Sequence, residues 1–329
     1  MREKQKLYFI VGPTASGKTA ASIEVAKRID AEVISADSIQ VYRGMDIGSA
    51  KPSMEERTGI PHHMLSVVAP DEPKFSVARF REMADACIVD IAAREKRPLV
   101  VGGTGLYVNA LTYPLSFTGA PADPMIREKY VSLEAEQPGA AHKRLQEVDP
   151  ASAARLHPND KKRVIRALEV FELTGRPISE NGEGFSALDA SKLPYTVRIA
   201  GLTMPREVLY ARIEQRVDRM MEQGLLDEVK ALLEKGYSPE LPALQGLGYK
   251  QLLSFLSGTI TLSEAVEAIK RETRRFAKRQ ITWFKREKDV TWLRRQELRK
   301  DSQALLQTME TELAERGIIE GKEQKGYFR

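Results

Sequence analysis

Apolar runs alternate with segments of helical periodicity along the first hundred residues of the chain. Each run is short and continuous, which is typical of a strand buried on both faces. We expect such strands at residues 7–11, 31–36, 99–101 and 195–202, and helices at residues 19–29 and 73–94. Strands that alternate with helices predict an α/β fold, in which helices cover both faces of a parallel sheet. Ligands bind such sheets beyond the carboxyl ends of the strands, so the loops after residues 11, 36 and 101 are the informative ones.

The pattern becomes mostly helical between residues 114 and 194. Asp123 and Asp149 each precede a proline, the usual arrangement of an N-cap residue before the first helical position. We expect Asn159 to cap a further helix over residues 161–173, and residues 179–192 to form a polar loop. From residue 205 onward we expect helices again. The chain therefore predicts a core of residues 1–114 and 194–329 with basic C-terminal helices, and an inserted helical subdomain of residues 115–193.

Composition narrows the class of protein. The chain has 329 residues, of which 42% are hydrophobic, as in an ordinary globular protein with a buried core. One cysteine excludes an internal disulfide, and four histidines beside it argue against a structural zinc site. No apolar run approaches the ~18 residues of a membrane span, and the polar N-terminus shows no secretory signal. We expect a cytoplasmic protein with no membrane partner, and a monomer.

Positive charge is concentrated near the C-terminus. The net charge is only +5, but residues 270–300 hold 13 Lys and Arg against 4 Asp and Glu. The basic positions Arg271, Arg274, Arg275, Lys278 and Lys285 share one helix face, and Ile269, Phe276, Gln280 and Phe284 share another. This indicates a helix docked on the core with its basic side outward, facing a polyanion. A solvated helix face is the alternative.

A phosphate-binding loop follows the first expected strand and opens a helix. Its residues fit G-x-x-x-x-G-K-[ST] and are Gly12, Pro13, Thr14, Ala15, Ser16, Gly17, Lys18 and Thr19. Main-chain N–H groups and the helix N-terminus favour phosphate oxygens, Lys18 adds a charge, and the Thr19 hydroxyl can ligate Mg²⁺. The loop indicates phosphate, although it does not specify ATP.

Two other strand ends carry candidate chemistry. Asp37 follows the second strand, where a carboxylate can hold a metal, accept a proton or cap a turn. The third strand ends in Gly102-Gly103-Thr104-Gly105, without the acidic residue that P-loop NTPases use for Mg²⁺. This weakens the interpretation as a kinase or ATPase.

Eight segments in consistent order resemble the tRNA dimethylallyltransferase family. They are G-P-T-A-S-G-K-T at 12–19, D-S-I-Q-V-Y at 37–42, M-D-I-G-S-A-K-P at 45–52, P-H-H at 61–63, G-G-T-G-L-Y at 102–107, H-P-N-D-K-K-R-V-I-R-A-L-E at 157–169, L-Q-G-L-G-Y-K at 244–250 and T-R-R-F-A-K-R-Q-I-T-W-F at 273–284. The resemblance spans about residues 6–290. The departures, Ile39 and Ser49 where alanine and threonine are frequent, remove no group that the chemistry needs.

The resemblance implies a P-loop NTPase-like core with an inserted helical subdomain, and a reaction. A dimethylallyl group would pass from dimethylallyl diphosphate to the N6 amine of adenine 37 in the tRNA anticodon loop, with Mg²⁺ as a helper. The phosphate loop would hold the diphosphate, Asp37 would be the base, and Thr104 would lie beside it. For the leaving group we also choose Arg212, with Arg216 second, although both could lie on a solvated helix face.

Further residues could hold the RNA. An extruded adenine could contact Asp37, Ser38, Ile39 and Gln40, while Tyr42 could stack on it or belong to the core. The candidate phosphate contacts are Lys161, Lys162, Arg163 and Arg166 on the insertion and Arg274, Lys278 and Arg279 near the C-terminus. We expect Trp283 and Trp292 to fill the core, and His62 and His63 to be structural.

Three rival functions remain open. A P-loop kinase for a small metabolite would explain the phosphate loop, but it would not explain the basic helix. A prenyltransferase acting on free adenine nucleotides would share the core, but it would have less need for basic clusters. An RNA-binding module with an inactive phosphate loop would not require Lys18, Thr19 and Asp37 to be intact.

Overall fold

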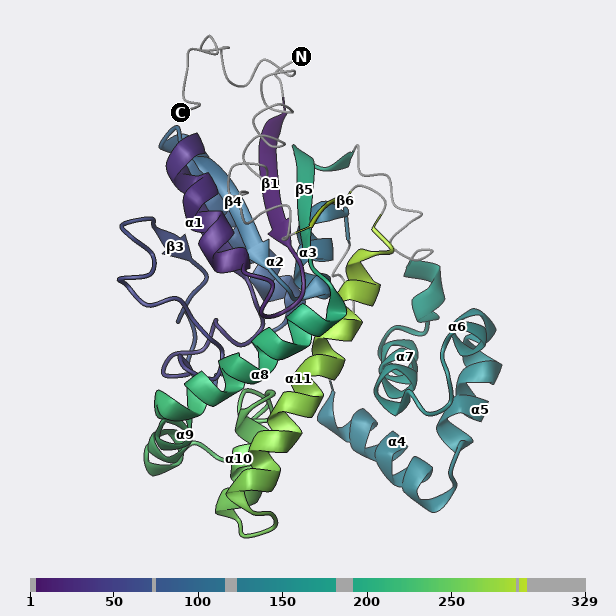
Figure 1. Ribbon diagram of the computed structural model, residues 1–329. Coiled ribbons are helices and arrows are strands. Elements are labelled where there is room, and N and C mark those ends of the chain that lie inside the picture. The colour runs from purple at the N-terminus through teal and green to yellow at the C-terminus, as the bar shows by residue number, and fades with distance from the viewer. Residues whose placement is uncertain (1–3, 73–74, 116–122, 182–191, 288–289, 295–329) are drawn as a thin grey trace, which may run out of the picture. The chain divides into compact units, whose positions relative to one another are not determined.

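A computed structural model describes residues 4–72, 75–115, 123–181, 192–287 and 290–294 (Figure 1). Its backbone divides into two compact units: a core unit of Met1–Thr112 and Pro194–Arg329, and a helical unit of Tyr113–Leu193. Each unit has its own hydrophobic core, so each is described by itself.

The core unit is built on a parallel sheet, which confirms the predicted fold class. Within the described residues the sheet has six strands in the order β3-β2-β4-β1-β5-β6. The strands are β1 (Gln5–Val11), β2 (Ala31–Ala36), β3 (His62–His63), β4 (Arg97–Gly102), β5 (Tyr195–Thr203) and β6 (Val290–Arg294). Tyr8, Ile10, Val33 and Leu99 are buried in one cluster with side chains of the first helix, as expected for strands covered on both faces.

Two strands were not predicted. His62 and His63 pair with Val33 and Ile34, so both histidines serve the sheet edge as the structural interpretation expected. β6 contradicts the expectation of helices throughout the region after residue 205. It pairs in parallel with residues 199–203 of β5, a partner that lies far away in the sequence. Its Trp292 ring covers Gly201, where an added Cβ would lie 2.9 Å from the ring, so this tryptophan packs on the sheet.

Helices flank the sheet and extend from it (Figure 1). In the core unit they are α1 (Lys18–Ile29), α2 (Val77–Ala93), α3 (Gly105–Thr112), α8 (Arg206–Glu222), α9 (Leu225–Glu234), α10 (Tyr249–Leu256) and α11 (Leu262–Phe284). The predicted helix over residues 73–94 begins at Val77, because the Ser76 hydroxyl caps it by accepting from the Arg79 N–H at 3.3 Å. α11 packs beside α8, and its buried positions are Ala265, Ile269, Ala277, Gln280 and Phe284.

The helical unit contains α4 (Pro124–Glu136), α5 (Ala140–Val148), α6 (Pro150–Arg155), α7 (Lys161–Thr174) and a 3-10 turn, η1 (Ile178–Asn181). Asp123 caps α4 and Asp149 caps α6, as predicted. The prediction for Asn159 is wrong, because Asp160 occupies the N-cap position of α7. The expected loop at 179–192 begins with η1, and its residues 182–191 lie outside the described residues.

Candidate active site

Three loops converge at the carboxyl edge of the sheet. β1, β2 and β4 are adjacent, and their last residues are in register: Gly102 lies opposite both Val11 and Ala36. Three segments predicted to carry chemistry therefore leave the sheet at one place. They are the phosphate loop of residues 12–19, the turn that begins at Asp37 and the turn that contains Thr104.

Glycines shape the phosphate loop. Gly12 has a φ of +147°, and an added Cβ there would lie 2.6 Å from the Leu202 carbonyl oxygen. Gly17 has a φ of +90° and is the N-cap of α1, so the helix opens directly at Lys18. The helix N-terminus and its unpaired N–H groups provide positive potential at this edge.

Lys18 lies within the loop and is partly buried. Its ammonium donates hydrogen bonds to the carbonyl oxygens of Gly12 (2.9 Å) and Pro13 (2.8 Å). Burial and, second to it, the charge of Arg216 lower the pKa of Lys18 from 10.5 to about 7, although the charge of Asp37 opposes both. The electrostatic coupling places all three groups in one neighbourhood, where a bound anion would favour the protonated lysine.

Asp37 begins a turn and keeps one oxygen available. Its Oδ1 accepts from the N–H groups of Ile39 (2.9 Å) and Gln40 (3.3 Å), which realises the capping role considered above. Within the described part of the chain, its Oδ2 accepts no hydrogen bond, and the residue is partly exposed. The same carboxylate can therefore shape the turn and accept a proton.

Thr104 lies directly beside this turn. Its hydroxyl accepts from the Ser38 N–H at 3.1 Å and lies 3.4 Å from the Ser38 hydroxyl. Its own N–H donates to the Ala36 carbonyl oxygen at 3.2 Å. The predicted closeness of Thr104 to the Asp37 turn is thus present in the structure, through Ser38.

Two arginines reach the phosphate loop from α8. Arg212 donates through Nε to the Ala15 carbonyl oxygen at 2.9 Å. Burial lowers the pKa of Arg216, and the carboxylate of Asp37 opposes that effect. An arginine nevertheless remains charged, so Arg216 adds positive charge close enough to Lys18 and Asp37 to affect both groups. Neither arginine lies on a merely solvated face.

Gln40 and Tyr42 are held by the protein itself. The Gln40 amide accepts from the Ser35 hydroxyl at 2.8 Å and donates to the carbonyl oxygens of Ser49 (3.3 Å) and Ala50 (3.2 Å). Tyr42 is buried in a core cluster, which is the structural alternative considered for it. In this state, both side chains stabilise the segment after Asp37.

Glu228 organises the same segment, and sequence reasoning missed it. Its carboxylate accepts from the N–H groups of Asp46 (2.8 Å), Ile47 (2.7 Å) and Gly48 (3.0 Å), and from the Tyr249 hydroxyl at 2.7 Å. The Tyr249 ring leaves no room for a Cβ at Gly48. The sequence gives only a weak signal for this role. Segments 45–52 and 244–250 both belong to the family resemblance, but nothing in the sequence connects them to a glutamate on α9.

Gln280 was also missed as a site residue, because it was grouped with the apolar face of its helix. It is buried on α11 and bonds to two of the site loops. Its Oε1 accepts from the Thr14 N–H at 2.8 Å, and its Nε2 donates to the Gly103 carbonyl oxygen at 2.9 Å. The signal that could have identified it is an uncharged polar residue at a core position, since a buried amide needs partners.

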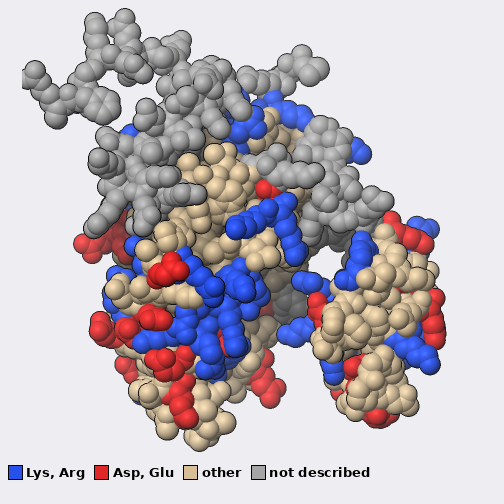
Figure 2. All heavy atoms as spheres, turned by 45° about the vertical axis from the view of Figure 1, so that its right-hand side comes forward, with Lys and Arg blue, Asp and Glu red and all other residues tan. Residues whose placement is uncertain are grey.

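Lys and Arg side chains gather on one face of the core unit, as Figure 2 shows. On α11, Lys278 and Arg279 are exposed and, within the described residues, have no carboxylate partner; the Arg279 guanidinium lies 5.8 Å from the Phe276 ring centroid. Arg274 instead pairs with Glu214 of α8 at 2.6 Å. Trp283 is packed over Gly105 and donates to Asn109 at 3.2 Å, as a core residue would.

The basic cluster of the helical unit is largely engaged with acidic neighbours. Lys161 lies 3.5 Å from Glu134, Arg163 lies 3.2 Å from Asp160, and Arg166 lies 2.6 Å from the buried Glu169. Lys162 is exposed and, among the described residues, has no such partner. The two predicted RNA-binding clusters therefore differ in how much of their charge is neutralised locally.

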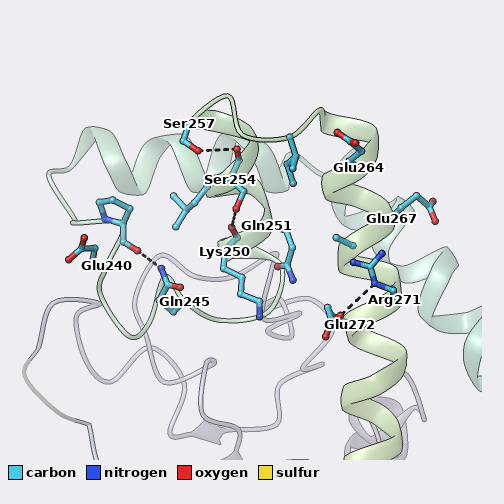
Figure 3. A pocket seen from close by; sticks show the side chains of 14 residues that line it. Glu240, Gln245, Lys250, Gln251, Ser254, Ser257, Glu264, Glu267, Arg271 and Glu272 are labelled. Atoms are coloured by element: carbon cyan, nitrogen blue, oxygen red, sulfur yellow. Dashed lines mark hydrogen bonds and ion pairs between the residues drawn. The ribbon is translucent and has the colours of Figure 1, made fainter. Parts of the chain in front are cut away.

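A separate hollow of about 860 Å³ lies between α10, α11 and the loop after residue 238 (Figure 3). Several carboxylates on its wall have partners. Glu272 pairs with Arg275 at 2.7 Å, Glu267 lies 3.5 Å from Lys270, and Glu264 caps α11 through Thr261. These three carboxylates therefore bond to nearby groups of the protein, and none of the residues that line the hollow belongs to the three loops.

Neither a metal-binding cluster nor a membrane-spanning helix is found among the described residues. No cluster of three His, Cys, Asp or Glu side chains there could hold a metal ion. None of the described helices has the length and apolar character needed to cross a membrane.

The parallel sheet, with the loop of residues 12–19 after β1 and the carboxylate of Asp37 after β2, defines a P-loop-like α/β protein. The chain belongs to the IPP transferase family, whose model matches residues 40–287, and the model described as isopentenyl transferase matches residues 5–67.

Curated proteins similar to the chain carry the name tRNA dimethylallyltransferase. The chain is 50% identical over 292 residues to the tRNA dimethylallyltransferase of Pelotomaculum thermopropionicum, covering 89% of this chain and 91% of that protein. It is 53% identical to the enzyme of the same name from Symbiobacterium thermophilum, covering 88% and 89%.

Solved structures agree. The tRNA isopentenylpyrophosphate transferase of Bacillus halodurans superposes with a TM-score of 0.71 at 42% identity, covering 95% of this chain and 98% of that one. A eukaryotic dimethylallyltransferase acting on tRNA gives a TM-score of 0.77 at 31% identity, covering 95% and 79%. The chain is therefore an enzyme of this family.

Proposed function

We propose that this chain transfers a dimethylallyl group from dimethylallyl diphosphate to the N6 amine of adenine 37 in tRNA and releases diphosphate. One observation carries the proposal at the site: the phosphate loop, the carboxylate of Asp37 and the Thr104 hydroxyl meet at a single edge of the sheet. The curated relatives that carry this activity in their names cover nearly the whole chain, which supports the same reaction.

The reaction forms one bond and breaks another. The N6 lone pair attacks the allylic carbon that bears the diphosphate, and the carbon–oxygen bond breaks with its electron pair leaving on the diphosphate. The amine nitrogen becomes positively charged and loses a proton. The adenine amine is a weak nucleophile, so the enzyme must stabilise the leaving group, align the reactants and accept that proton.

Asp37 suits the role of proton acceptor. Its Oδ2 is available, while its Oδ1 is fixed by the turn, so the carboxylate is held in one orientation. A positioned base contributes about 10²–10⁴-fold to such a reaction. Thr104 and Ser38 lie beside it and would orient the incoming amine or the donor oxygens.

The phosphate loop and the two α8 arginines suit the diphosphate. Lys18 and the N–H groups at the start of α1 would neutralise the charge that develops as the bond breaks. The N–H of Thr14 is already bonded to Gln280, so the anion contacts fall to the later residues of the loop. Arg212 and Arg216, which approach the loop and Lys18, would supply the additional charge.

The residues at the site fit Mg²⁺ in one specific manner. Mg²⁺ takes oxygen ligands and commonly binds through substrate phosphates and water, without an all-protein cage. The loop offers the Thr19 hydroxyl, and no cluster of three acidic or histidine side chains exists among the described residues. Thr19 would therefore hold the ion, which, when bound, neutralises charge on the diphosphate.

The exposed basic residues suit the RNA. Lys278 and Arg279 on α11, together with Arg274, lie on the core unit, and Lys161, Lys162, Arg163 and Arg166 lie on the helical unit, whose proposed role is to contact tRNA. Adenine 37 must leave the anticodon loop stack to reach Asp37. Ser38, Ile39 and Gln40 adjoin the base and would contact the extruded adenine through their main chain and exposed atoms. We propose that one monomer suffices.

The direct test combines the purified chain with dimethylallyl diphosphate, Mg²⁺ and unmodified tRNA, followed by nucleoside mass analysis. We expect N6-dimethylallyladenosine at one position and release of one diphosphate per modified adenine. Parallel reactions replace tRNA with AMP, and dimethylallyl diphosphate with ATP and free metabolites. Modification of AMP at a rate equal to that of tRNA, or ATP turnover with a metabolite, would contradict the proposal in favour of the rival enzymes.

A further inference from the structure

Gln280 joins two of the loops that meet at the site. It lies on α11 with 6% of its surface exposed. One of its partners lies in the loop after β1, and the other lies in the turn after β4. It accepts from the Thr14 N–H of the phosphate loop and donates to the Gly103 carbonyl oxygen beside Thr104. Both partners lie more than 170 residues away in the sequence, so the bonds are purely tertiary.

The fit around this amide is tight. An added Cβ at Gly103 would lie 2.2 Å from the Gln280 Nε2, and one at Gly105 would lie 2.4 Å from the Trp283 ring. The end of α11 is thus seated on the turn that carries Thr104. A primary amide is suited to this position because it offers a donor and an acceptor side by side. A carboxylate of the same length offers acceptors only, and an apolar side chain offers neither a donor nor an acceptor.

We propose that Gln280 is a positioning residue for prenyl transfer, which sets the distance between the phosphate loop and the turn that carries Thr104. This inference rests on the proposed function. The donor diphosphate and the base approach the reacting atoms from these two loops, and a misplacement of about 1 Å can lower the rate by about 10². In this proposal Gln280 acts through the two main-chain groups that it holds, and not through a contact of its own with a substrate.

Two substitutions test the two halves of the bridge. Gln280→Glu keeps the acceptor for the Thr14 N–H but directs a carboxylate oxygen at the Gly103 carbonyl oxygen, so the two loops should move apart. Gln280→Met keeps nearly the same volume, removes both hydrogen bonds and is the variant that folds more readily. Both should lower the rate of the chemical step without changing tRNA binding.

A matched control is available in the same unit. Gln251 is also a glutamine with 6% exposure, and its Oε1 accepts from the Gly248 N–H at 3.0 Å at the start of α10. Among the described residues it has no hydrogen bond to any of the three loops. Gln251→Glu therefore measures the effect on stability of placing a carboxylate at a buried glutamine, separately from any effect on the site.

The experiment measures single-turnover rate, tRNA dissociation constant, pyrophosphate affinity and urea midpoint for each variant. We expect about a 10²-fold loss of rate for Gln280→Glu and for Gln280→Met, pyrophosphate binding weakened about tenfold, and tRNA affinity within twofold of the original chain. Gln251→Glu should keep its rate within threefold at a comparable urea midpoint.

Two outcomes would overturn the inference. One is a rate in both Gln280 variants within threefold of that of Gln251→Glu; the other is a loss of tRNA affinity as large as the loss of rate. Failure of the unsubstituted chain to modify tRNA would instead overturn the proposed function, and pyrophosphate affinity would still report whether Gln280 holds the phosphate loop.

Discussion

Two lysines on the same unit show how position changes what one residue type can do. Lys18 is partly buried in the phosphate loop, and burial together with Arg216 lowers its pKa to about 7. Lys278 is exposed on α11 and, among the described residues, has no carboxylate partner. A charge in a partly buried site interacts strongly with its neighbours, whereas an exposed charge is screened by water and salt. The strand edge is therefore suited to charge that develops during a reaction, and α11 to the fixed charges of an RNA backbone.

Between the two lysines, the largest effect should come from removing each of them in turn. Lys18→Ala should lower kcat/KM for the prenyl donor by about 10²–10³-fold and leave the tRNA dissociation constant within twofold, because the proposed role of Lys18 is to stabilise the leaving group only. Lys278→Ala should instead weaken tRNA binding several-fold and leave the rate at saturating tRNA and donor unchanged. Steady-state kinetics and filter binding give both values. Equal effects of the two substitutions on both values would remove the distinction between the regions.

The pH dependence of diphosphate binding should report Lys18 directly. A bound anion favours the protonated lysine, so its pKa rises from about 7 on binding. Affinity should therefore be greatest below pH 7 and should fall by up to about tenfold per pH unit above it. Calorimetry at pH 8 in buffers of different ionisation heat should detect uptake of nearly one proton. Binding that is independent of pH between 7 and 9, without proton uptake, would show that Lys18 is already charged.

Glu228 allows a smaller test away from the reacting groups. Glu228→Gln places an amide nitrogen where the carboxylate now accepts from three main-chain N–H groups, so at least one of them loses its partner. We expect the free energy of unfolding to fall by about 1–2 kcal/mol, measured by urea titration. Tyr249→Phe removes only one donor to the same carboxylate, and its effect should be smaller. The opposite ranking would mean that Glu228 does not hold residues 46–48.

The two basic clusters should differ in salt dependence. Lys278→Ala with Arg279→Ala removes two charges without local partners, and the slope of log affinity against log salt should decrease by about 2. Lys161→Ala with Arg163→Ala removes charges paired with Glu134 and Asp160, so the slope should change less. Fluorescence titrations of tRNA between 50 and 300 mM salt would rank them. A larger change for the second pair would contradict the expectation that the unpaired charges of α11 contribute more to tRNA binding than the paired charges of the helical unit.

The sequence predicted the sheet and the position of its loops because both depend on local patterns. Continuous apolar runs marked β1, β2, β4 and β5, and the phosphate loop follows from spacing alone. What was missed depends on partners far away in the chain. β6 exists because Val290–Arg294 lies beside β5, and a basic surrounding sequence concealed it. Gln280 and Glu228 gain their roles only when α11 and α9 are folded against the loops.

Helix caps and ion pairs also divide into those that the sequence predicts and those that only the folded backbone determines. Asp123 and Asp149 were identified as caps because the cap and its proline are adjacent in sequence. Asp160 was passed over for its neighbour Asn159, since both residue types suit an N-cap and only the backbone decides between them. Arg274 looked equivalent to Lys278 on a helical projection, and Glu214 of α8 distinguishes the two.

The central claim is that Asp37 accepts the amine proton beside a diphosphate held by the phosphate loop. Single-turnover prenylation by Asp37→Asn, with tRNA and donor both saturating, tests it most directly. Asp30→Asn is the matched control, because Asp30 follows α1, lies before β2 and pairs with Lys96 at the opposite end of the strand. We predict a rate loss of about 10³-fold for Asp37→Asn, unchanged tRNA affinity, and full activity for Asp30→Asn. A rate for Asp37→Asn within tenfold of that of Asp30→Asn would contradict the claim.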